Sequence, residues 1–396
     1  MFTPDDLMGP AAPVRLTQAP QYSQSLLPVL PCAVTKAGPL CAAVLTSGAQ
    51  LATIRLAWNS LYHRALAPRA TLSFEWVTTA WRHIAEPSGA RLCVVVVHNT
   101  ERRLLALWPI VVHVHHRLWR RARQLCASWD YNDILIDSNE SPYPLVDLAW
   151  QALTRASRAD LIALSLVPAA SPLHHLLTTK AAKVTDQTSI DTINWDGIAN
   201  WQNYYRKISD RPGWDRRERR LREQGEVTFG IATSPDEAVR AIQWVLTQKR
   251  LWLDRKGKSS DWLHEPGYEN FLLASVKSMR DAARIVVFTL TLDCQLIAVQ
   301  VSLVDEHRMF CHHTAFDPAF AKFSPGILVL KFTLSWAFER RLLLDLGYGH
   351  EANKTALANS SYDVADFLVV NSAWGHWHQA LKRYRSPSVS RDALPS

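Results

Sequence analysis

The stretch KFSPGILVLKFTLSWAFER, residues 322–340, constrains the fold of this chain more than any other part of its sequence. Ser324 suits the position that caps a helix, Pro325 suits the first helical position, and Gly326 leaves the next amide without a side chain in front of it. The 12 residues that follow are almost all apolar, and Lys331 is the one charge among them; this run is too uniform for a helix on a wet surface. We therefore expect a helix buried against a sheet, with an N-terminus open to a phosphate or a developing negative charge. An ordinary capped core helix explains this stretch equally well.

The same order of elements occurs twice in the sequence. Apolar runs bounded by turn residues predict three strands, a helix and a fourth strand in each copy. In the first copy these segments are 92–97, 104–115, 123–129, 142–156 and 161–167. In the second copy they are 284–292, 295–304, 308–316, 322–340 and 342–348. Two earlier helices are predicted at 51–66 and at 73–84, the latter capped by Ser73. This order indicates two copies of one supersecondary unit, with two unrelated α/β pieces as the alternative.

The length of 396 residues suits two domains of ordinary size. We expect a first domain over 45–189 and a second over 190–385. A loose leader over 1–44, rich in proline, alanine and serine, and a disordered tail over 386–396 would flank them. A helix dense in arginine is predicted at 214–223, behind the breakers proline and glycine.

Charge and cysteine usage limit the partners and the compartment. The formal net charge of +8 favours anionic partners such as a nucleotide, a nucleic acid or a phospholipid surface. No apolar run reaches the roughly 18 residues that cross a bilayer, so we expect no transmembrane segment, and peripheral association with a membrane stays open. Asp5 and Asp6 stand where a signal peptide carries basic residues. The 6 scattered cysteines form no CxxC pair, and no ligand set has metal spacing, so we expect a cytoplasmic protein with reduced thiols and no metal.

Several segments match a known family. They are AFDPAFAKFSPGILVLKFTLSWAFER, LLLDLGYG and EANK in the second copy, RPGWDRRERRLREQGEVTF ahead of it, and LLALWPIVV and SWDYNDILID in the first copy. Together they resemble the GNAT-like acyltransferases of the CelD group of cellulose and exopolysaccharide biosynthesis proteins, which are related to the FemAB peptidyltransferases. The resemblance covers most of residues 45–385. It implies an α/β (α+β) fold with tandem GNAT-like domains, each a mixed, mostly antiparallel sheet flanked by helices.

The sequence also departs from this family. Classical GNAT enzymes hold the pyrophosphate of acyl-CoA in a glycine-rich loop, which is reduced here to residues 324–326. CoA binding is therefore implied by the fold and not by a full motif. Where the family shows a Gly-Asp pair and an aromatic residue, this chain has Gly349, His350 and Asn353 before Lys354.

The resemblance places the acyl donor at the start of the predicted helix over 322–340. Ser324 and Gly326 are the first candidates to contact it, and Arg216 and Arg220 of the basic helix are candidates to neutralise its phosphates. A plain helix cap explains the first pair equally well, and a solvated helix face explains the arginines.

Three residues after the last strand are candidates for the chemistry. Tyr348 could protonate a leaving thiolate, His350 could take a proton from the attacking group, and Lys354 could pair with a phosphate or carboxylate. No residue has the setting of a covalent nucleophile, so we expect direct attack on the donor.

Four further residues are candidates for binding the acceptor. Asp130, Tyr131 and Asp133 could bind a sugar or an amine, although a solvated loop explains them nearly as well. His312 and His313 are adjacent on a predicted strand and should face opposite sides, so at most one lines a cleft, and we assign His313 to it.

The sequence thus predicts an acyltransferase that moves an acyl group from acetyl-CoA or another acyl-CoA to an amine or hydroxyl. The acceptor implied by the resemblance is a small molecule or glycan precursor of the envelope or of an exopolysaccharide. One alternative is a FemAB-like transferase that takes its acyl group from an aminoacyl-tRNA, which the basic charge and the reduced loop favour. The other is a non-catalytic GNAT-like scaffold in polysaccharide biosynthesis.

Overall fold

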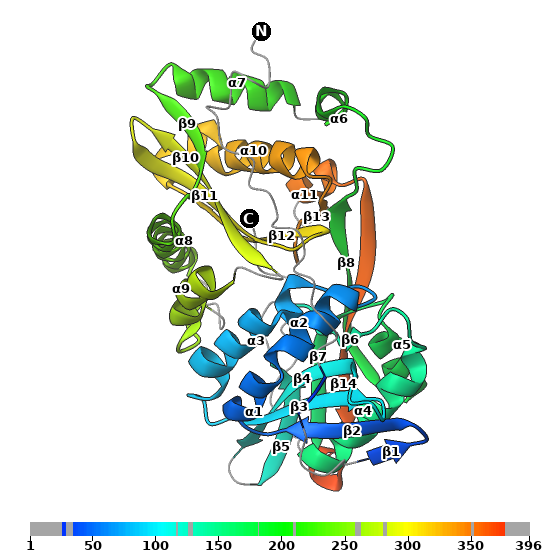
Figure 1. Cartoon of the computed structure of the whole chain (residues 1–396). Helices are drawn as coiled ribbons and strands as arrows, with labels where there is room; N and C mark the ends of the chain where they lie inside the picture. The colour runs from blue at the N-terminus through cyan, green and yellow to red at the C-terminus, as the bar shows by residue number, and fades with distance from the viewer. Residues whose placement is uncertain are drawn as a thin grey trace. The chain divides into compact units, whose positions relative to one another are not determined.

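Two compact units make up the chain in the computed structural model shown in Figure 1. The structure describes residues 26–28, 35–115, 118–125, 130–180, 182–208, 211–257, 263–279, 283–349 and 352–376. Of these, residues 194–257 and 283–345 form the smaller unit, and all the others form the larger unit. The chain therefore enters the larger unit three times. The contiguous domain ranges expected from the sequence stay a prediction.

The smaller unit is built on a sheet with the strand order β13-β12-β11-β10-β9. These strands are β9 (Val227–Ile231), β10 (Arg284–Leu292), β11 (Gln295–Val304), β12 (Arg308–Phe316) and β13 (Leu343–Asp345). β12 and β13 are parallel and the other neighbours are antiparallel. A parallel pair needs a crossover connection, which η4 (Pro318–Phe323) and α10 (Pro325–Glu339) provide.

Helices cover both faces of this sheet (Figure 1). On one face, the Phe288 ring of β10 packs edge-on against Phe332 and Trp336 of α10, with ring centroids 5.9 and 5.3 Å away. α8 (Pro235–Lys256) covers the other face and contacts β10, β11 and β12. It begins in a capping box between Ser234 and Glu237, which satisfies its first amides. α6 (Trp201–Lys207) and α7 (Arg211–Arg222) complete the unit.

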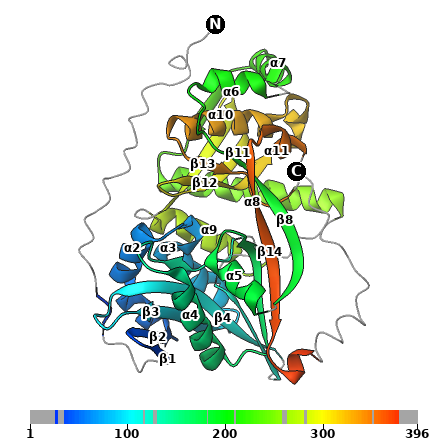
Figure 2. The same cartoon turned by 90° about the vertical axis from the view of Figure 1, so that its right-hand side faces the viewer.

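The strands of the larger unit have the order β1-β2-β3-β4-β5-β7-β14-β8, with β6 beside β4. Its strands are β1 (Thr35–Ala37), β2 (Leu40–Leu45), β3 (Arg91–His98), β4 (Leu104–His115), β5 (Trp119–Gln124), β6 (Leu135–Ile136), β7 (Leu161–Pro168), β8 (Lys183–Ile193) and β14 (Ser360–Val370). Its helices are α1 (Gly48–Thr53), α2 (Arg55–Arg64), η2 (Ala70–Leu72), α3 (Phe74–Ala80), η3 (Trp81–Ala85), α4 (Pro142–Ser157), α5 (Pro172–Thr179), α9 (Tyr268–Ser278) and α11 (Ala352–Leu357). Figure 2 shows β14 and β8 running side by side.

The predicted repeat is present in both units. β3, β4 and β5 are antiparallel neighbours, α4 follows them, and β7 returns parallel to β5. β10, β11, β12, α10 and β13 repeat this order. Hairpins close locally and the one parallel step in each unit is bridged by an apolar helix. The prediction of mixed, mostly antiparallel sheets flanked by helices is therefore confirmed.

Some element boundaries differ from those predicted. The helix expected over 51–66 is divided at Ile54, which ends α1 and precedes α2. The third strand of the first copy begins earlier, at Trp119, and residues 126–129 lie outside the described part of the chain. The basic helix begins at Arg211, so its proline and glycine lie inside the first turn, where a missing N–H costs nothing. Ser73 caps α3 as predicted, because its Oγ accepts the Trp76 amide.

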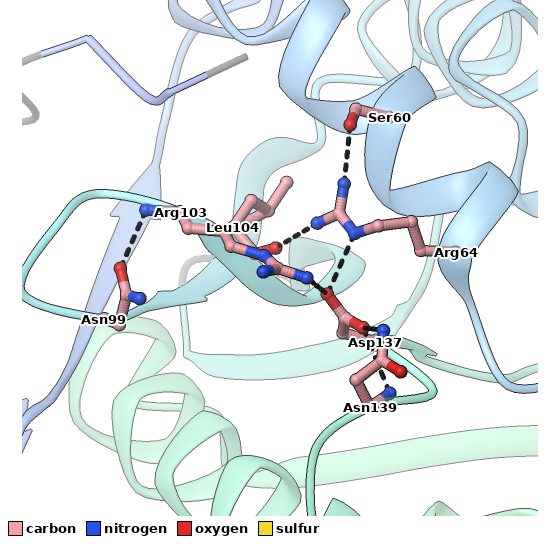
Figure 3. Close-up of polar contacts among 7 residues, drawn as sticks. All are labelled: Ser60, Arg64, Asn99, Arg103, Leu104, Asp137 and Asn139. Carbon is pink, nitrogen blue, oxygen red and sulfur yellow. Dashed lines mark hydrogen bonds and ion pairs between the residues drawn. The ribbon is translucent and has the colours of Figure 1, made fainter. Parts of the chain in front are cut away.

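A buried carboxylate, Asp137, joins three elements of the larger unit (Figure 3). Its Oδ2 accepts hydrogen bonds from Arg64 of α2 at 2.9 Å and from Arg103, at the start of β4, at 2.8 Å. Its Oδ1 accepts from the backbone and side chain of Asn139 at 3.1 and 3.2 Å. Burial raises the pKa of Asp137, but these hydrogen bonds and the Arg64 charge outweigh it, so the pKa lies below its usual value. Asp137 is therefore ionised and pins α2 to the sheet.

None of the helices in the described ranges combines the length and apolar character that crossing a bilayer requires.

Candidate functional site

The N-terminus of α10 has an unusual first turn. Ser324 stands at the capping position with φ 52° and ψ 54°, and its side chain makes no capping hydrogen bond. The predicted side-chain cap is wrong, because that bond needs an extended backbone at the cap. The Ser324 carbonyl instead accepts the amides of Ile327 and Leu328 at 3.0 and 3.3 Å. Because Pro325 has no N–H, the amide that this turn can offer to a ligand is that of Gly326.

Gly326 lies directly against strand β12. A Cβ atom at this position would stand 3.3 Å from Cδ1 of Phe316 and 3.9 Å from Cγ2 of Thr314. Both β12 side chains are exposed, Phe316 to 36%. The Thr314 hydroxyl donates to Oε1 of the buried Gln300 on β11, which holds it in place. The helix therefore approaches the strand through a gap that only glycine leaves open.

The sheet also opens at this point. β13 pairs with β12 at three positions, the last of which is Phe310 with Asp345. β12 continues to Phe316 along β11, and its partner there is Ala298. Strand β12 thus runs on beyond its pairing with β13, beside the first turn of α10. The sequence interpretation placed the acyl donor at the start of this helix.

A β-bulge at His312 overturns the prediction for the two histidines. Val301 pairs with His313, and the next β11 residue, Ser302, pairs with Cys311, so His312 is the extra residue. A bulge breaks the alternation of side chains, and the two imidazole rings contact each other with centroids 4.2 Å apart. They do not face opposite sides. Burial, His312 and Lys249 hold the pKa of His313 well below its usual value, so this imidazole is neutral.

The acidic residues of the basic helix α7 turn towards α10. Lys331, the one charge in the apolar run, contacts Glu218 at 2.8 Å and Asp215 at 3.1 Å. Burial raises the pKa of Glu218, but Lys331 and Arg222 outweigh it, so the pKa lies below its usual value. Three arginines of α7 are exposed. They are Arg216, Arg219 and Arg220.

The predicted acceptor residues of the larger unit are buried. Asp130 is 1% exposed, Tyr131 2% and Asp133 7%. Asp133 accepts the Ser171 hydroxyl at 2.5 Å, and its other oxygen lies 3.8 Å from Nε of Arg69, whose guanidinium stands 4.7 Å from the Tyr131 ring centroid. The sequence interpretation did not include Arg69. The role of the three residues in acceptor binding stays a prediction.

The predicted catalytic residues follow β13. Lys354, on α11, donates through Nζ to the backbone carbonyl of Tyr348 at 3.2 Å, which ties the loop between them. His350 lies outside the described residues. Tyr348 and Lys354 belong to the larger unit, and Ser324 and Gly326 belong to the smaller one. The catalytic assignment therefore stays a prediction.

Sequence reasoning missed Thr314, Phe316 and Gln300 as walls of the candidate site. Thr314 and Phe316 lie beside the first turn of α10, and Gln300 holds Thr314, only because β11 and β12 pair in one register, with a bulge just before Thr314. A shift of one residue along a strand exchanges its two faces, so no local signal in the sequence identifies these residues. Within the described ranges, no group of three histidine, cysteine or acidic side chains could hold a metal ion.

Comparison with known proteins agrees with this geometry. Residues 211–355 match the family described as the acetyltransferase (GNAT) domain. The matched segment contains α10 and the residues around its first turn. No curated protein matches the sequence.

Solved structures show the fold of the whole chain. The crystal structure of FemX is 10% identical, with a TM-score of 0.59 over 83% of this chain and 98% of FemX. A tandem GNAT protein from the clavulanic acid biosynthesis pathway is 12% identical, with a TM-score of 0.50 over 84% of this chain and 99% of that protein. L-PGS from Bacillus licheniformis is 11% identical, with a TM-score of 0.50 over 85% of this chain and 96% of that protein. At these identities the likeness shows a tandem GNAT-like fold and no shared substrate.

Proposed function

We propose that this protein transfers an acyl group from acyl-CoA, such as acetyl-CoA, to an amine or hydroxyl of a sugar or of an envelope or exopolysaccharide precursor. The observation that carries the proposal is the first turn of α10, where Gly326 lies against the part of β12 that extends past its pairing with β13, inside the segment that matches the acetyltransferase family. The acceptor class and a cytoplasmic location rest on the CelD-group resemblance and on the scattered cysteines.

The residues at the α10 N-terminus fit an acyl-CoA. Gly326 places no side chain over its own amide, and a Cβ there would stand 3.3 Å from the Phe316 ring. The positive end of the helix dipole and the Gly326 amide favour the diphosphate of the donor. α7 contacts η4 just ahead of this turn, and we assign Arg216 and Arg220 to the remaining phosphate charge. The exposed side chains of Thr314 and Phe316 would border the acyl end of the donor.

The chemistry would be direct attack of the acceptor on the thioester. The attacking amine or hydroxyl forms a bond to the acyl carbon while the carbon–sulfur bond breaks. The acceptor must lose its proton, and the leaving CoA thiolate must gain one. We assign the acceptor proton to His350, protonation of the thiolate to Tyr348 and an anionic group of the substrate to Lys354. If single replacements of these three residues leave turnover unchanged, this assignment is wrong.

Calorimetric titration with acetyl-CoA tests the donor site. We compare the unaltered protein with Gly326→Glu, which adds a negative charge at the first turn, and with Gln243→Glu, which adds the same charge at an exposed position of α8. The proposal expects binding that disappears in Gly326→Glu and persists in Gln243→Glu. Equal binding by all three proteins places the donor elsewhere, and no binding by the unaltered protein favours a scaffold or another donor.

The exposed arginines of α7 favour one alternative, a FemAB-like transferase with an aminoacyl-tRNA donor. Lys331 of α10 pairs with Asp215 and Glu218 of α7. The exposed arginines of α7 therefore form a cationic surface that suits an RNA backbone. This donor predicts tRNA binding that weakens steeply with salt and is reduced in Arg216→Gln and Arg220→Gln. Failure to bind tRNA at low salt removes the alternative.

A further inference from the structure

Strands β4 and β5 form a hairpin in the larger unit (Figure 1), and rings and guanidinium groups alternate along one of its faces. In the register of these antiparallel strands, Val111 is opposite Arg123, His113 is opposite Arg121, and His115 is opposite Trp119. Residues directly opposite each other, and residues two apart, share a face of a sheet. We call these ring and guanidinium side chains the hairpin ladder. They are His113, His115, Trp119, Arg121 and Arg123.

The hairpin ladder lies on the face opposite helix α4. Trp108, Ile110 and Val112 of β4 point into the hydrophobic core that contains the buried side of α4. His113 and His115 alternate with these positions and therefore point the other way. Every member of the hairpin ladder is partly exposed. The solvated face of an antiparallel sheet commonly carries polar side chains, and here two arginines stand beside three rings, a combination that suits a planar anionic ligand.

The rings form a flat platform. His115 and Trp119 stack with centroids 4.2 Å apart and an angle of 14° between their planes. The His113 ring follows at 6.3 Å and 33°. A planar ring that adds to such a stack gains dispersion and cation–π contact without needing a particular hydrogen-bond pattern.

Contacts with its neighbours hold the guanidinium group of Arg123 beside the platform. Nε of Arg123 donates to Nε2 of His113 at 3.0 Å. Burial and the charges of Arg123, His115 and Arg121 lower the pKa of His113 to about 4, so His113 stays a neutral acceptor at neutral pH. Glu265 lies 3.7 Å from Nη2 of Arg123 and offsets part of one charge. The planar forks of the two arginines match the oxygens of a phosphate.

We propose that the hairpin ladder binds a nucleoside phosphate, with the base on the His115–Trp119 platform and the phosphate at Arg121 and Arg123. The site belongs to the larger unit and is separate from the donor residues of α10, which belong to the smaller unit. The nucleoside phosphate can be a free nucleotide or one unit of a single-stranded nucleic acid, which share this chemistry.

Titration of the full chain with ADP tests the site, and a single-stranded uridylate decamer tests the second source. Arg121→Gln removes one fork, and we expect ADP to bind at least about tenfold more weakly. Trp119→Leu removes the platform, and we expect a loss of roughly fivefold or more. Arg120→Gln is the matched control, because its side chain lies on the same strand and the opposite face, and ADP binding should change by less than about twofold. Arg121→Lys keeps the charge without the fork and should fall between.

A parallel titration in Gly326→Glu separates this site from the donor site. ADP binding that survives in Gly326→Glu and falls in Arg121→Gln supports the hairpin ladder, whatever the fate of acetyl-CoA. Tighter binding of the decamer than of ADP identifies nucleic acid as the source. No ADP or decamer binding by the unaltered protein, an equal loss in Arg120→Gln, or a loss confined to Gly326→Glu overturns the proposal. The thermal unfolding of each variant must match that of the unaltered protein. If Trp119→Leu unfolds at a lower temperature, Trp119→Phe, which keeps a ring, takes its place, and Arg121→Lys likewise takes the place of Arg121→Gln.

Discussion

Helices α4 and α10 occupy the same place in the two copies of the fold, but their first turns differ. α4 begins with Pro142, Tyr143 and Pro144, and α10 begins with Pro325 and Gly326. Proline has no N–H, so α4 has lost two of its first three amides and carries an aromatic ring where α10 carries glycine. The second residue of the helix is thus a glycine in one copy and a tyrosine in the other, and we infer that only the glycine lets an anion reach the amide at this position.

The strands next to these helices also differ in how far they stay bonded to their parallel neighbours. In the larger unit, Asn132 exchanges hydrogen bonds with Ser165 of β7, through its amide at 3.3 Å and its Oδ1 at 3.1 Å. This contact lies beyond the last pair of β5 and β7, which is Arg123 with Ala163. In the smaller unit, the corresponding strand β12 runs on past its parallel neighbour. One copy fills the separation of its strands with its own chain, and we infer that the other keeps it for a ligand.

The largest expected effect tests whether the larger unit depends on the late strand β14. Phe367 of β14 is 2% exposed and lies in the core with α4. We expect Phe367→Ala to lower the free energy of unfolding by about 3–5 kcal/mol. Urea denaturation followed by fluorescence measures this loss. Leu251→Ala, at a position 45% exposed on α8 of the smaller unit, should cost less than about 1 kcal/mol, and equal losses would contradict the expectation.

The next prediction concerns the carboxylate that pins α2 in the larger unit. Asp137→Asn leaves two arginines beside a neutral amide and should cost about 3 kcal/mol at neutral pH. Because the folded pKa of Asp137 is depressed, its contribution is complete above the unfolded pKa and disappears as the pH falls through the folded pKa. Denaturation at several pH values checks both points. Asp147→Asn, whose carboxylate is 45% exposed beside Lys180, is the control and should change stability by less than about 0.5 kcal/mol.

The difference between the two helix starts can be tested by giving α10 the second residue of α4. Gly326→Tyr gives α10 the residue that stands second in α4, and its side chain would meet Phe316. We expect acetyl-CoA to bind about a hundredfold more weakly, the equivalent of about 2.7 kcal/mol. Tyr143→Ala, at a position 56% exposed, should leave acetyl-CoA binding unchanged. A loss in Tyr143→Ala would show that the larger unit takes part in donor binding.

The smallest expected effect concerns the ion pairs between Lys331 of α10 and the two acidic residues of α7. Lys331→Gln removes two ion pairs, with Glu218 15% and Asp215 48% exposed, and should cost about 1 kcal/mol at neutral pH. The folded pKa of Glu218 is depressed, so this difference should fade as the pH drops through it. Stability of both proteins at neutral and acidic pH tests this. Lys256→Gln, exposed on α8, should have no such effect, and a pH-independent loss in Lys331→Gln would argue against the ion pairs.

Local chemistry in the sequence predicted the repeated order of strands and helices. Apolar runs, polar turns and the Ser-Pro starts of α4 and α10 act over a few residues, so they can be read without knowing the fold. Gly326 was identified in this way, and its position against β12 agrees with that interpretation. The cap at Ser324 was wrong, because the turn from η4 into α10 sets a left-handed backbone that no local preference of serine predicts.

Only the tertiary structure decided which side chains meet. The bulge at His312 brings two histidines together that simple alternation would separate, and the register of β4 with β5 assembles the hairpin ladder. The ion pairs of Lys331 join residues more than 100 positions apart. Such contacts depend on strand register and on long-range packing, which the order of residues along the chain does not encode locally. Local patterns along the chain were therefore enough to predict the order of the elements and the Pro-Gly start of α10, whereas strand register and long-range packing set which side chains surround it.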